Sequence, residues 1–265
     1  MSVNFDLRIP VKNRILVKNR LLAALPSEEY LSLLPHLESV SLPFKQVLYK
    51  SREPIEQVYF PNKGVISLLT NIESSTIAEV GLVGLEGMAG LPIFLGVETT
   101  PLQAIVQVPG DAMRMKADVF KDLLKRSSSL HTLLLRYTHA LMLQISQSAA
   151  CNCHHSVSQR CCRWLLMTHD RVSSDSFPLT HQFLSQMLGV RRASVTVVAG
   201  RLQQVGLIAY SHGQITILER IGLEEAACGC YGLVKQELER IGLEEAACKC
   251  ARQTGGVPLE RLAYH

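Results

Sequence analysis

The feature that most limits the fold of this chain is the stretch LTHQFLSQMLGVRRASVTVVAGRLQQVGLI at residues 179–208. Gly189 in its middle permits a sharp turn, and Gly206 near its end stops a helix. Two short helices joined by a tight turn that contains glycine predict a helix-turn-helix. Apolar residues recur at helical spacing on both sides of the turn, namely Phe183, Leu184, Met187 and Leu188 before it and Val195, Val198, Leu202 and Val205 after it.

The residues around these helices favour a nucleic-acid partner. IAY and QITIL follow the second helix, and the SHG between them predicts a β-hairpin, or wing. The formal net charge is +4, and residues 176–218 contain no Asp or Glu but keep Arg191, Arg192 and Arg201. A basic stretch without acids suits a polyanion, and Arg191 and Arg192 open the second helix, the end that enters the major groove in helix-turn-helix proteins. The alternative is a plain helical hairpin in a mildly basic domain.

Residues 40–113 have a different character. Short β-branched or aromatic runs such as VLYKS, QVYFP, GVISLLT and TIAEVGLV are separated by Gly, Pro and Asn. This pattern predicts a compact antiparallel β-barrel or jelly roll. The expected fold class is α+β, with a barrel sensor domain at 1–127, a dimerisation helix and hinge at 128–155, a winged helix-turn-helix domain at 156–235 and a duplicated tail at 236–265.

A long helix is expected from about Ser128 to His154, which at 1.5 Å per residue would run ~40 Å. Steps of four and three residues along it predict a coiled-coil seam, and we expect a homodimer paired along this seam. The alternative is a helix that lies along its own barrel. SVSQ at 156–159 has the form of a capping box and begins a new helix. The seam residues are Leu130, Leu134, Tyr137, Leu141, Gln144, Ser148, Cys151 and His155.

In this order of elements, and most specifically in LTHQFLSQMLGVRRASVTVVAGRL, residues 21–235 resemble the cyclic-AMP receptor/Fnr (Crp/Fnr) superfamily of bacterial transcription regulators. The resemblance implies a homodimer that binds a double-stranded DNA operator with inverted-repeat symmetry, with RNA polymerase as a further partner. It implies that Arg192 reads a guanine and that Thr180 and Gln182 contact phosphates. Ala193 and Val197 stand where relatives often carry polar base-reading residues, which departs from the usual half-site. Further DNA contacts are expected from Arg191, Ser194, Thr196 and Arg201.

The same resemblance leaves little room for a cyclic nucleotide in the barrel. Relatives that bind one hold its phosphate with an arginine and its sugar with a glutamate, and here Leu102 and Met88 stand near these positions. Residues 64–113 contain no Lys, Arg or His. A buried phosphate needs a cation or many amide donors. We therefore expect no cyclic-nucleotide dependence, and a barrel that is filled by side chains or takes an uncharged ligand.

The stretch CNCHHSVSQRCC at 151–162 raises the alternative of a regulator that senses metal or thiol redox state. Cys151, His155, Cys161 and Cys162 are the candidate ligands, since thiolate and imidazole suit zinc or copper(I). The stretch has no C-x-x-C spacing, and reduced Cys is a common small core residue. We expect a structural hinge, no metal and no cofactor. An eleven-residue repeat, LERIGLEEAAC at 218–228 and 238–248, places C-x-C pairs at 228/230 and 248/250, which we interpret as products of duplication.

Other classes of protein are disfavoured by what the sequence lacks. No apolar run approaches the ~18 residues of a membrane span, and no secretory signal is visible at the N-terminus. The eight cysteines are therefore expected to be reduced thiols in a cytoplasm. The chain lacks G-x-x-x-x-G-K-[ST], G-x-S-x-G and H-E-x-x-H, so we do not expect an enzyme. A ligand-binding module that does not need DNA remains the other interpretation.

Overall fold

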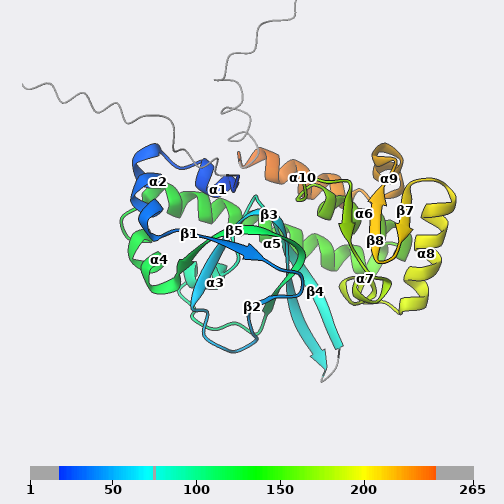
Figure 1. Cartoon of the computed structure of the whole chain (residues 1–265), viewed down its shortest axis with the longest axis horizontal. Coiled ribbons are helices and arrows are strands. Elements are labelled where there is room, and N and C mark those ends of the chain that lie inside the picture. Colours follow the sequence, from blue (N-terminus) through cyan, green and yellow to red (C-terminus); the bar gives the residue numbers. More distant parts are fainter. Residues whose placement is uncertain (1–17, 74–75, 243–265) are drawn as a thin grey trace, which may run out of the picture.

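The computed structural model describes residues 18–73 and 76–242, so residues 243–248 of the second tail repeat and the tail after them lie outside the described residues. A β-barrel domain and a winged helical domain lie at opposite ends of the molecule (Figure 1). The long helix α5, Ser128–His154, spans both of them. The α+β fold class is confirmed, and no helix among the described residues is long and apolar enough to cross a membrane.

The barrel is a five-stranded antiparallel sheet in the order β1-β5-β3-β4, with β2 paired to β5. Its long strands β3 and β5 bend through several register shifts where they pair between Pro61 and Ile66. Gly64 and Gly110 sit at this bend, where the two backbones come so close that a Cβ on Gly110 would lie 2.1 Å from the Lys63 carbonyl oxygen. The strands are β1 (Glu38–Leu42), β2 (Val47–Tyr49), β3 (Gln57–Glu73), β4 (Thr76–Val83) and β5 (Gln103–Lys116).

Short helices close the barrel, and their apolar side chains complete its core. Phe120 of α4 meets Phe60 of β3 edge to face, with ring centroids 6.1 Å apart. Leu21, Leu22 and Leu33 from the first helices are fully buried in the same cluster. These elements are α1 (Arg20–Ala23), α2 (Ser27–Leu33), η2 (Leu34–His36), α3 (Leu91–Phe94) and α4 (Ala117–Leu124).

The predicted long helix is confirmed from Ser128 to His154, but its predicted seam does not face outward. Leu130 and Leu134 are fully buried, and the other large seam residues are almost fully buried, in the chain's own core. Gln144 is held there too, because its amide bonds the backbone of Leu82 on β4 through both Oε1 and Nε2. The dimer interface predicted at Leu130, Leu134, Tyr137, Leu141 and Gln144 is therefore wrong. The apolar stripe packs on the nearest large apolar surface, which is the barrel.

The winged domain contains the expected elements and one additional strand. α6 begins with the predicted capping box, in which Ser156 and Gln159 each bond the other's backbone. β6 pairs with β8, so the wing is a three-stranded sheet in the order β6-β8-β7. Val205, expected on the buried face, caps the end of α8 and is 68% exposed. The elements are α6 (Val157–His169), β6 (Ser176–Pro178), α7 (His181–Leu188), α8 (Arg192–Gln204), β7 (Ile208–Ser211), β8 (Gln214–Ile217), α9 (Arg220–Ala226) and α10 (Cys230–Arg240).

The two domains share one apolar cluster. Val65, Leu82 and Val108 of the barrel pack in the same cluster as the buried residues of α6, α7 and α8. Phe44, next to β2, also approaches Phe183 of α7, with ring centroids 6.1 Å apart. The barrel therefore holds α7 directly, and α7 carries the start of the helix-turn-helix.

Candidate nucleic-acid interface

The turn between α7 and α8 has the geometry that the sequence predicts. Thr180 caps α7 by accepting a hydrogen bond from the Phe183 amide, 3.1 Å away. Gly189 adopts the left-handed conformation at φ 61°, which suits glycine and ends α7 sharply. Arg191 follows as the N-cap of α8, and Arg192 is the first residue of that helix. Both arginines are exposed at the positive end of the helix dipole, where phosphate is favoured.

His181 joins both helices to the wing. Its imidazole stacks on Tyr210 of β7, with ring centroids 4.3 Å apart. Its Nδ1 lies 3.1 Å from the hydroxyl of Thr196 on α8. Burial, and then the neighbouring Arg192, lower the pKa of His181, so a neutral ring is favoured at this junction. The start of α7, the first turns of α8 and the wing therefore meet at one place, and sequence patterns did not identify His181 or Tyr210.

One face of α8 is left free by this packing. Val195, Val198 and Leu202 are buried against the domain. The opposite face is exposed, and its apolar member Val197 is 54% exposed. The exposed residues are Arg192, Ala193, Thr196, Val197, Gly200, Arg201, Gln203 and Gln204. Together they form a surface that a helix could present to a groove.

The predicted contact residues are not equivalent within this surface. Thr180, Gln182 and Arg201 are exposed, whereas Ser194 is only partly so. The Thr196 hydroxyl lies within hydrogen-bond distance of both the Arg192 carbonyl and His181. Because its hydroxyl already bonds within the protein, the exposed Thr196 is better suited to positioning His181 than to contacting a ligand. Thr180 accepts its capping bond and keeps its hydroxyl proton available.

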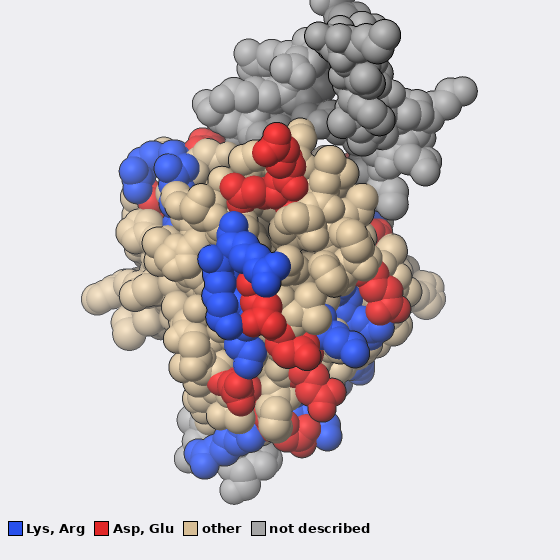
Figure 2. Space-filling view, turned by 90° about the vertical axis from the view of Figure 1, so that its left-hand side faces the viewer, with Lys and Arg blue, Asp and Glu red and all other residues tan. Residues whose placement is uncertain are grey.

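The charge of the barrel differs from that of this surface. Exposed ion pairs on the barrel join Lys50 to Glu53 and Lys125 to Asp122. Figure 2 looks at the end of the molecule that lies on the left of Figure 1, where basic and acidic side chains lie next to one another. By contrast, residues 176–218 bring exposed arginines and no acid to the helix-turn-helix. The winged domain therefore offers the more suitable surface for a polyanion.

Side chains occupy the barrel loop around Met88, where we expect no cyclic nucleotide. Met88 is fully buried, and the Tyr137 hydroxyl of α5 donates a 3.3 Å hydrogen bond to its carbonyl oxygen. A Cβ on Gly87 would lie 2.2 Å from the Tyr137 ring, so the loop and α5 are in close contact. Leu102, which is half-buried, adds no cation.

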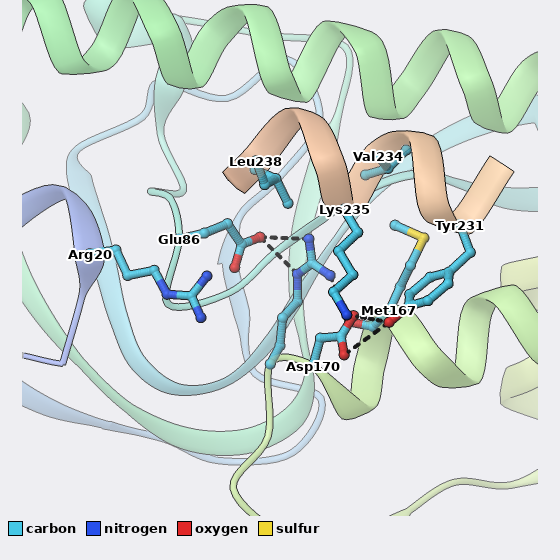
Figure 3. Close-up of a pocket in the computed structure, with 9 residues that line it drawn as sticks. Arg20, Glu86, Met167, Asp170, Tyr231, Val234, Lys235 and Leu238 are labelled. Carbon is cyan, nitrogen blue, oxygen red and sulfur yellow. Dashed lines mark hydrogen bonds and ion pairs between the residues drawn. The ribbon is translucent and has the colours of Figure 1, made fainter. Parts of the chain in front are cut away.

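Glu86 of this loop binds the winged domain instead of a ligand. Its Oε1 lies 2.7 Å from both Nε and Nη2 of Arg171, and both side chains are 4% exposed. Arg171 follows α6, and its Nη1 also donates to the Met167 carbonyl at 2.6 Å. Both residues line a small pocket together with Arg20, Asp170 and residues of α10, and Figure 3 shows Glu86 at this pocket. The pair fixes the barrel loop to the end of α6.

A second polar connection crosses the same boundary at Glu79 of β4. The Trp164 indole of α6 donates to Glu79 Oε1 at 2.8 Å, and the Ser67 hydroxyl lies 2.6 Å from Glu79 Oε2. That hydroxyl also lies 2.6 Å from Gln107 Oε1 and can donate its one proton to only one of the two acceptors. Burial raises the pKa of Glu79 to about 7, against its hydrogen bonds and the nearby arginines. If Glu79 is protonated and donates to the Ser67 hydroxyl, that hydroxyl can donate its own proton to Gln107, and each hydrogen bond then has one donor and one acceptor.

We expect stability to depend on pH through this group. Because the folded pKa of about 7 lies above the ordinary value of 4.5, Glu79 stabilises the fold at low pH and loses this contribution as pH rises through 7. Glu79→Gln keeps a donor for Ser67 and should flatten this decline. Urea unfolding from about pH 5 to about pH 8 measures it. Exposed Glu28→Gln is the control, and an unchanged slope in Glu79→Gln would contradict the assignment.

The cysteines divide into two groups. Cys161 and Cys162 are buried in the apolar cluster of the winged domain, and burial raises the pKa of Cys162 to about 11. They do not join Cys151 and His155, so the four candidate ligands taken from the sequence do not lie together. α6 is buried on most of its faces, so the two adjacent thiols both lie in the core.

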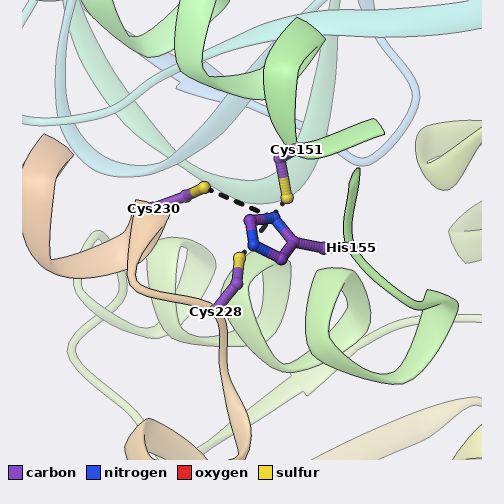
Figure 4. A group of neighbouring side chains, drawn as sticks. All are labelled: Cys151, His155, Cys228 and Cys230. Carbon is purple, nitrogen blue, oxygen red and sulfur yellow. Dashed lines mark hydrogen bonds between the residues drawn. The ribbon is translucent and has the colours of Figure 1, made fainter. Parts of the chain in front are cut away.

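Cys228 and Cys230 take the place beside Cys151 and His155 instead. The sulfurs of Cys151 and Cys228 are 3.4 Å apart, and the Cys230 sulfur is 3.6 Å from His155 Nδ1. Figure 4 shows the three sulfurs arranged around the imidazole. The C-x-C spacing at 228/230 was the sequence signal for this group. Because we interpreted that spacing as a product of duplication, the sequence alone did not connect Cys228 and Cys230 with Cys151 and His155.

The comparisons with known proteins agree with this architecture. Residues 159–226 match the Crp-like helix-turn-helix domain. The Global nitrogen regulator of Nostoc sp. is 24% identical over 181 residues, which cover 64% of this chain and 81% of that protein. The Global nitrogen regulator of Synechocystis sp. is 23% identical over 183 residues, which cover 65% of this chain and 81% of that protein. These relatives are regulators by name.

The similar solved structures show the same fold. FixK2 from Bradyrhizobium japonicum superposes with a TM-score of 0.62 at 15% identity, covering 72% of this chain and 98% of that chain. A CRP-family transcriptional regulator from Thermus thermophilus gives a TM-score of 0.61 at 16% identity, covering 71% and 96%. The order of barrel, long helix and winged helix-turn-helix is therefore shared with both.

Proposed function

We propose that this chain, which belongs to the Crp/Fnr family of DNA-binding transcription regulators, acts as a homodimer on an inverted-repeat operator. The observation that carries the proposal is the exposed surface formed by the start of α7, the free face of α8 and the wing. This surface holds Arg191, Arg192 and Arg201 and contains no acid. In the proposed complex α8 enters the major groove, while Thr180 and Gln182 contact phosphates.

Selection from random DNA identifies the operator. Purified full-length protein is incubated with randomised double-stranded DNA, and bound sequences are enriched and read. We expect an inverted repeat whose half-sites are ~34 Å apart, because two symmetric α8 helices would meet successive major grooves. Enrichment of a direct repeat, or of no sequence at all, would refute the proposed mode of binding.

A different stripe of α5 from the one expected is suited to pairing. Exposed residues recur along the helix at alternating steps of four and three, which is the spacing of a coiled-coil seam. Leu135 and Met142 on this stripe are 52% and 63% exposed, so two large apolar side chains face outward one heptad apart. The stripe consists of Ser128, Thr132, Leu135, His139, Met142, Ser146, Ala149 and Cys153. Ser148, the remaining expected contact, is half-buried on the first stripe and bonds Arg163 and the Gln144 carbonyl.

Charged residues on this stripe should separate the two copies. We expect wild-type protein to scatter light with about twice the 29.4 kDa chain mass, and Leu135→Glu/Met142→Glu to be monomeric at micromolar concentration. Repulsion between like charges and the loss of apolar contact both oppose pairing. Each ~1.4 kcal/mol of lost binding free energy raises the dissociation constant of the dimer tenfold. Leu95→Glu/Val97→Glu is a matched control, because it changes two exposed apolar residues of the barrel. A dimer that survives the first change but not the second would place the interface on the barrel.

The remaining elements of the proposal concern the effector ligand, the protein partner and the cellular compartment. Because Glu86 is paired with Arg171 and Tyr137 lies against the loop, we infer that cyclic nucleotides do not control this regulator. RNA polymerase is the expected protein partner beyond the second copy, and the cytoplasm is the expected compartment. The chain is then a non-enzymatic switch whose output is transcription.

A further inference from the structure

Four side chains from two distant parts of the chain point at one another beneath the winged domain. Cys151 lies in the last turn of α5 and His155 is the C-cap of that helix, while Cys228 and Cys230 lie at the junction of α9 with α10. Their ligand atoms all lie within 4.8 Å of one another (Figure 4). Cys151, Cys228 and Cys230 also form a buried cluster of their own, separate from the two large apolar cores.

We propose that Cys151, His155, Cys228 and Cys230 bind one structural zinc ion that fastens α10 and the end of the winged domain to the long helix α5. Three thiolates and one imidazole are a common donor set for structural zinc. All four positions of a tetrahedron are then taken by protein, which leaves no place for a substrate and favours a structural role. The proposal does not depend on DNA binding.

The distances agree with the size of such a site. With Zn–S of about 2.3 Å and Zn–N of about 2.0–2.1 Å, a tetrahedral ion separates two of its sulfurs by about 3.8 Å and a sulfur from a nitrogen by about 3.6 Å. The Cys151–Cys228 sulfurs are 3.4 Å apart, and the Cys230 sulfur is 3.6 Å from His155 Nδ1. Small side-chain rotations are therefore enough to reach the coordinated geometry.

The surroundings support the ligands. Gln147, one turn before Cys151 on α5, donates its amide to the Cys230 sulfur at 3.0 Å. Such outer hydrogen bonds orient ligands and help to set metal affinity. The buried Arg160 guanidinium lies close enough to Cys151 and Cys228 to interact electrostatically with their sulfurs. Since zinc with three thiolates carries a net charge of −1, a buried cation beside it balances that charge.

The position gives the ion structural leverage. α5 ends at His154, and α6 starts at Val157 after a short hinge. α10 returns from the end of the winged domain to lie along α5, where His139 Nε2 is 3.0 Å from Glu237 Oε1. A zinc ion would add a strong connection at the hinge end of this helix pair. The two helices would then be held together by metal–ligand bonds as well as by contacts between their side chains.

Metal content of the purified full-length protein tests the proposal directly. After incubation with zinc under reducing conditions and gel filtration, we expect about one zinc ion per chain by mass spectrometry. Cobalt(II) should substitute and give the intense visible absorption of a tetrahedral thiolate site. Cys228→Ser and His155→Gln should lose most of the metal. Gln147→Ala should bind zinc about 10–100-fold more weakly, in competition with a chromogenic chelator.

The sequence supplies a matched control for each ligand position. Cys153→Ser and His154→Gln change exposed neighbours of Cys151 and His155 on the same turn and should keep the metal. Cys248→Ser/Cys250→Ser, outside the described residues, should also keep it. Far-ultraviolet circular dichroism verifies that each variant is folded, and the partly exposed His155 keeps the test valid if a cysteine variant does not fold.

Several outcomes would overturn the proposal. Wild-type protein that retains less than about a tenth of an equivalent of zinc would do so. A Cys151–Cys228 disulfide found by mass mapping of protein kept under physiological thiol would point to redox chemistry instead. If the site retained copper(I) in preference to zinc, the proposed identity of the metal would be wrong. Equal losses in His154→Gln and His155→Gln would show that the metal is bound elsewhere. None of these results affects the operator measurement.

Discussion

Glu86→Ala is expected to lower the free energy of unfolding by about 3–5 kcal/mol, because it leaves the Arg171 guanidinium buried without its partner. Both side chains are 4% exposed, so water cannot solvate the remaining charge. Arg171 also cannot easily move away, since its Nη1 is bonded to the Met167 carbonyl and its side chain passes directly over Gly84. The change in urea midpoint at constant slope measures the effect.

Two further variants separate the pair from the packing around it. Glu86→Leu combined with Arg171→Met removes both charges and should recover most of the loss, since apolar replacement of a buried ion pair is often neutral or stabilising. Lys121→Ala breaks the exposed pair with Glu98, whose side chain is 71% exposed, and should change stability much less, because solvent screens such a pair. If Glu86→Ala cost no more than Lys121→Ala, the barrel loop would not be fastened to α6 by this pair.

The sequence predicted those parts of the fold that depend on neighbouring residues. Gly189 and the apolar residues on both sides of it determine the helix-turn-helix locally, and Ser156 with Gln159 determines the start of α6. The short strands of the barrel were visible for the same reason. In each case the side chains that decide the structure lie within a few residues of the backbone they act on.

The orientation of α5 could not be predicted in the same way. The helix carries two stripes with steps of four and three, one through Leu134 and one through Leu135, and periodicity alone does not say which stripe meets the barrel. The decision depends on β4, where the backbone of Leu82 bonds Gln144. A polar residue within an apolar stripe was therefore a sign of a specific buried partner.

Pairs that are distant in the sequence account for the other contacts that the sequence did not predict. Glu86 and Arg171 are 85 residues apart, and Cys151 and Cys228 are 77 apart. Cys161 and Cys162 were candidate partners of Cys151 because they are close to it in sequence. They lie on α6, however, a new helix that starts after the capping box and places both side chains in the core. The correct partners follow α9, and only the packing of α10 on α5 brings them near.

Arg192→Ala is expected to weaken operator binding by ~1–3 kcal/mol and to relax sequence preference at one symmetric base pair. Arg192 is exposed at the first position of α8, and the acid-free stretch around it, residues 176–218, offers its guanidinium no carboxylate. Its exposure, away from the buried core of the domain, means that the substitution should leave stability unchanged. Binding to the selected operator and to a scrambled duplex of equal length should be measured at several salt concentrations.

The contrast with phosphate contacts is what makes this result informative. Gln182→Ala removes an exposed polar group at the start of α7 and should weaken operator and scrambled DNA alike, because phosphates carry no sequence information. Arg201→Ala is the matched control, since it removes the same charge from the far end of the same face of α8. If Arg192→Ala lowered both affinities equally, as a lost phosphate contact would, then Arg192 would not read a base and α8 would lie in the groove differently from the way proposed here.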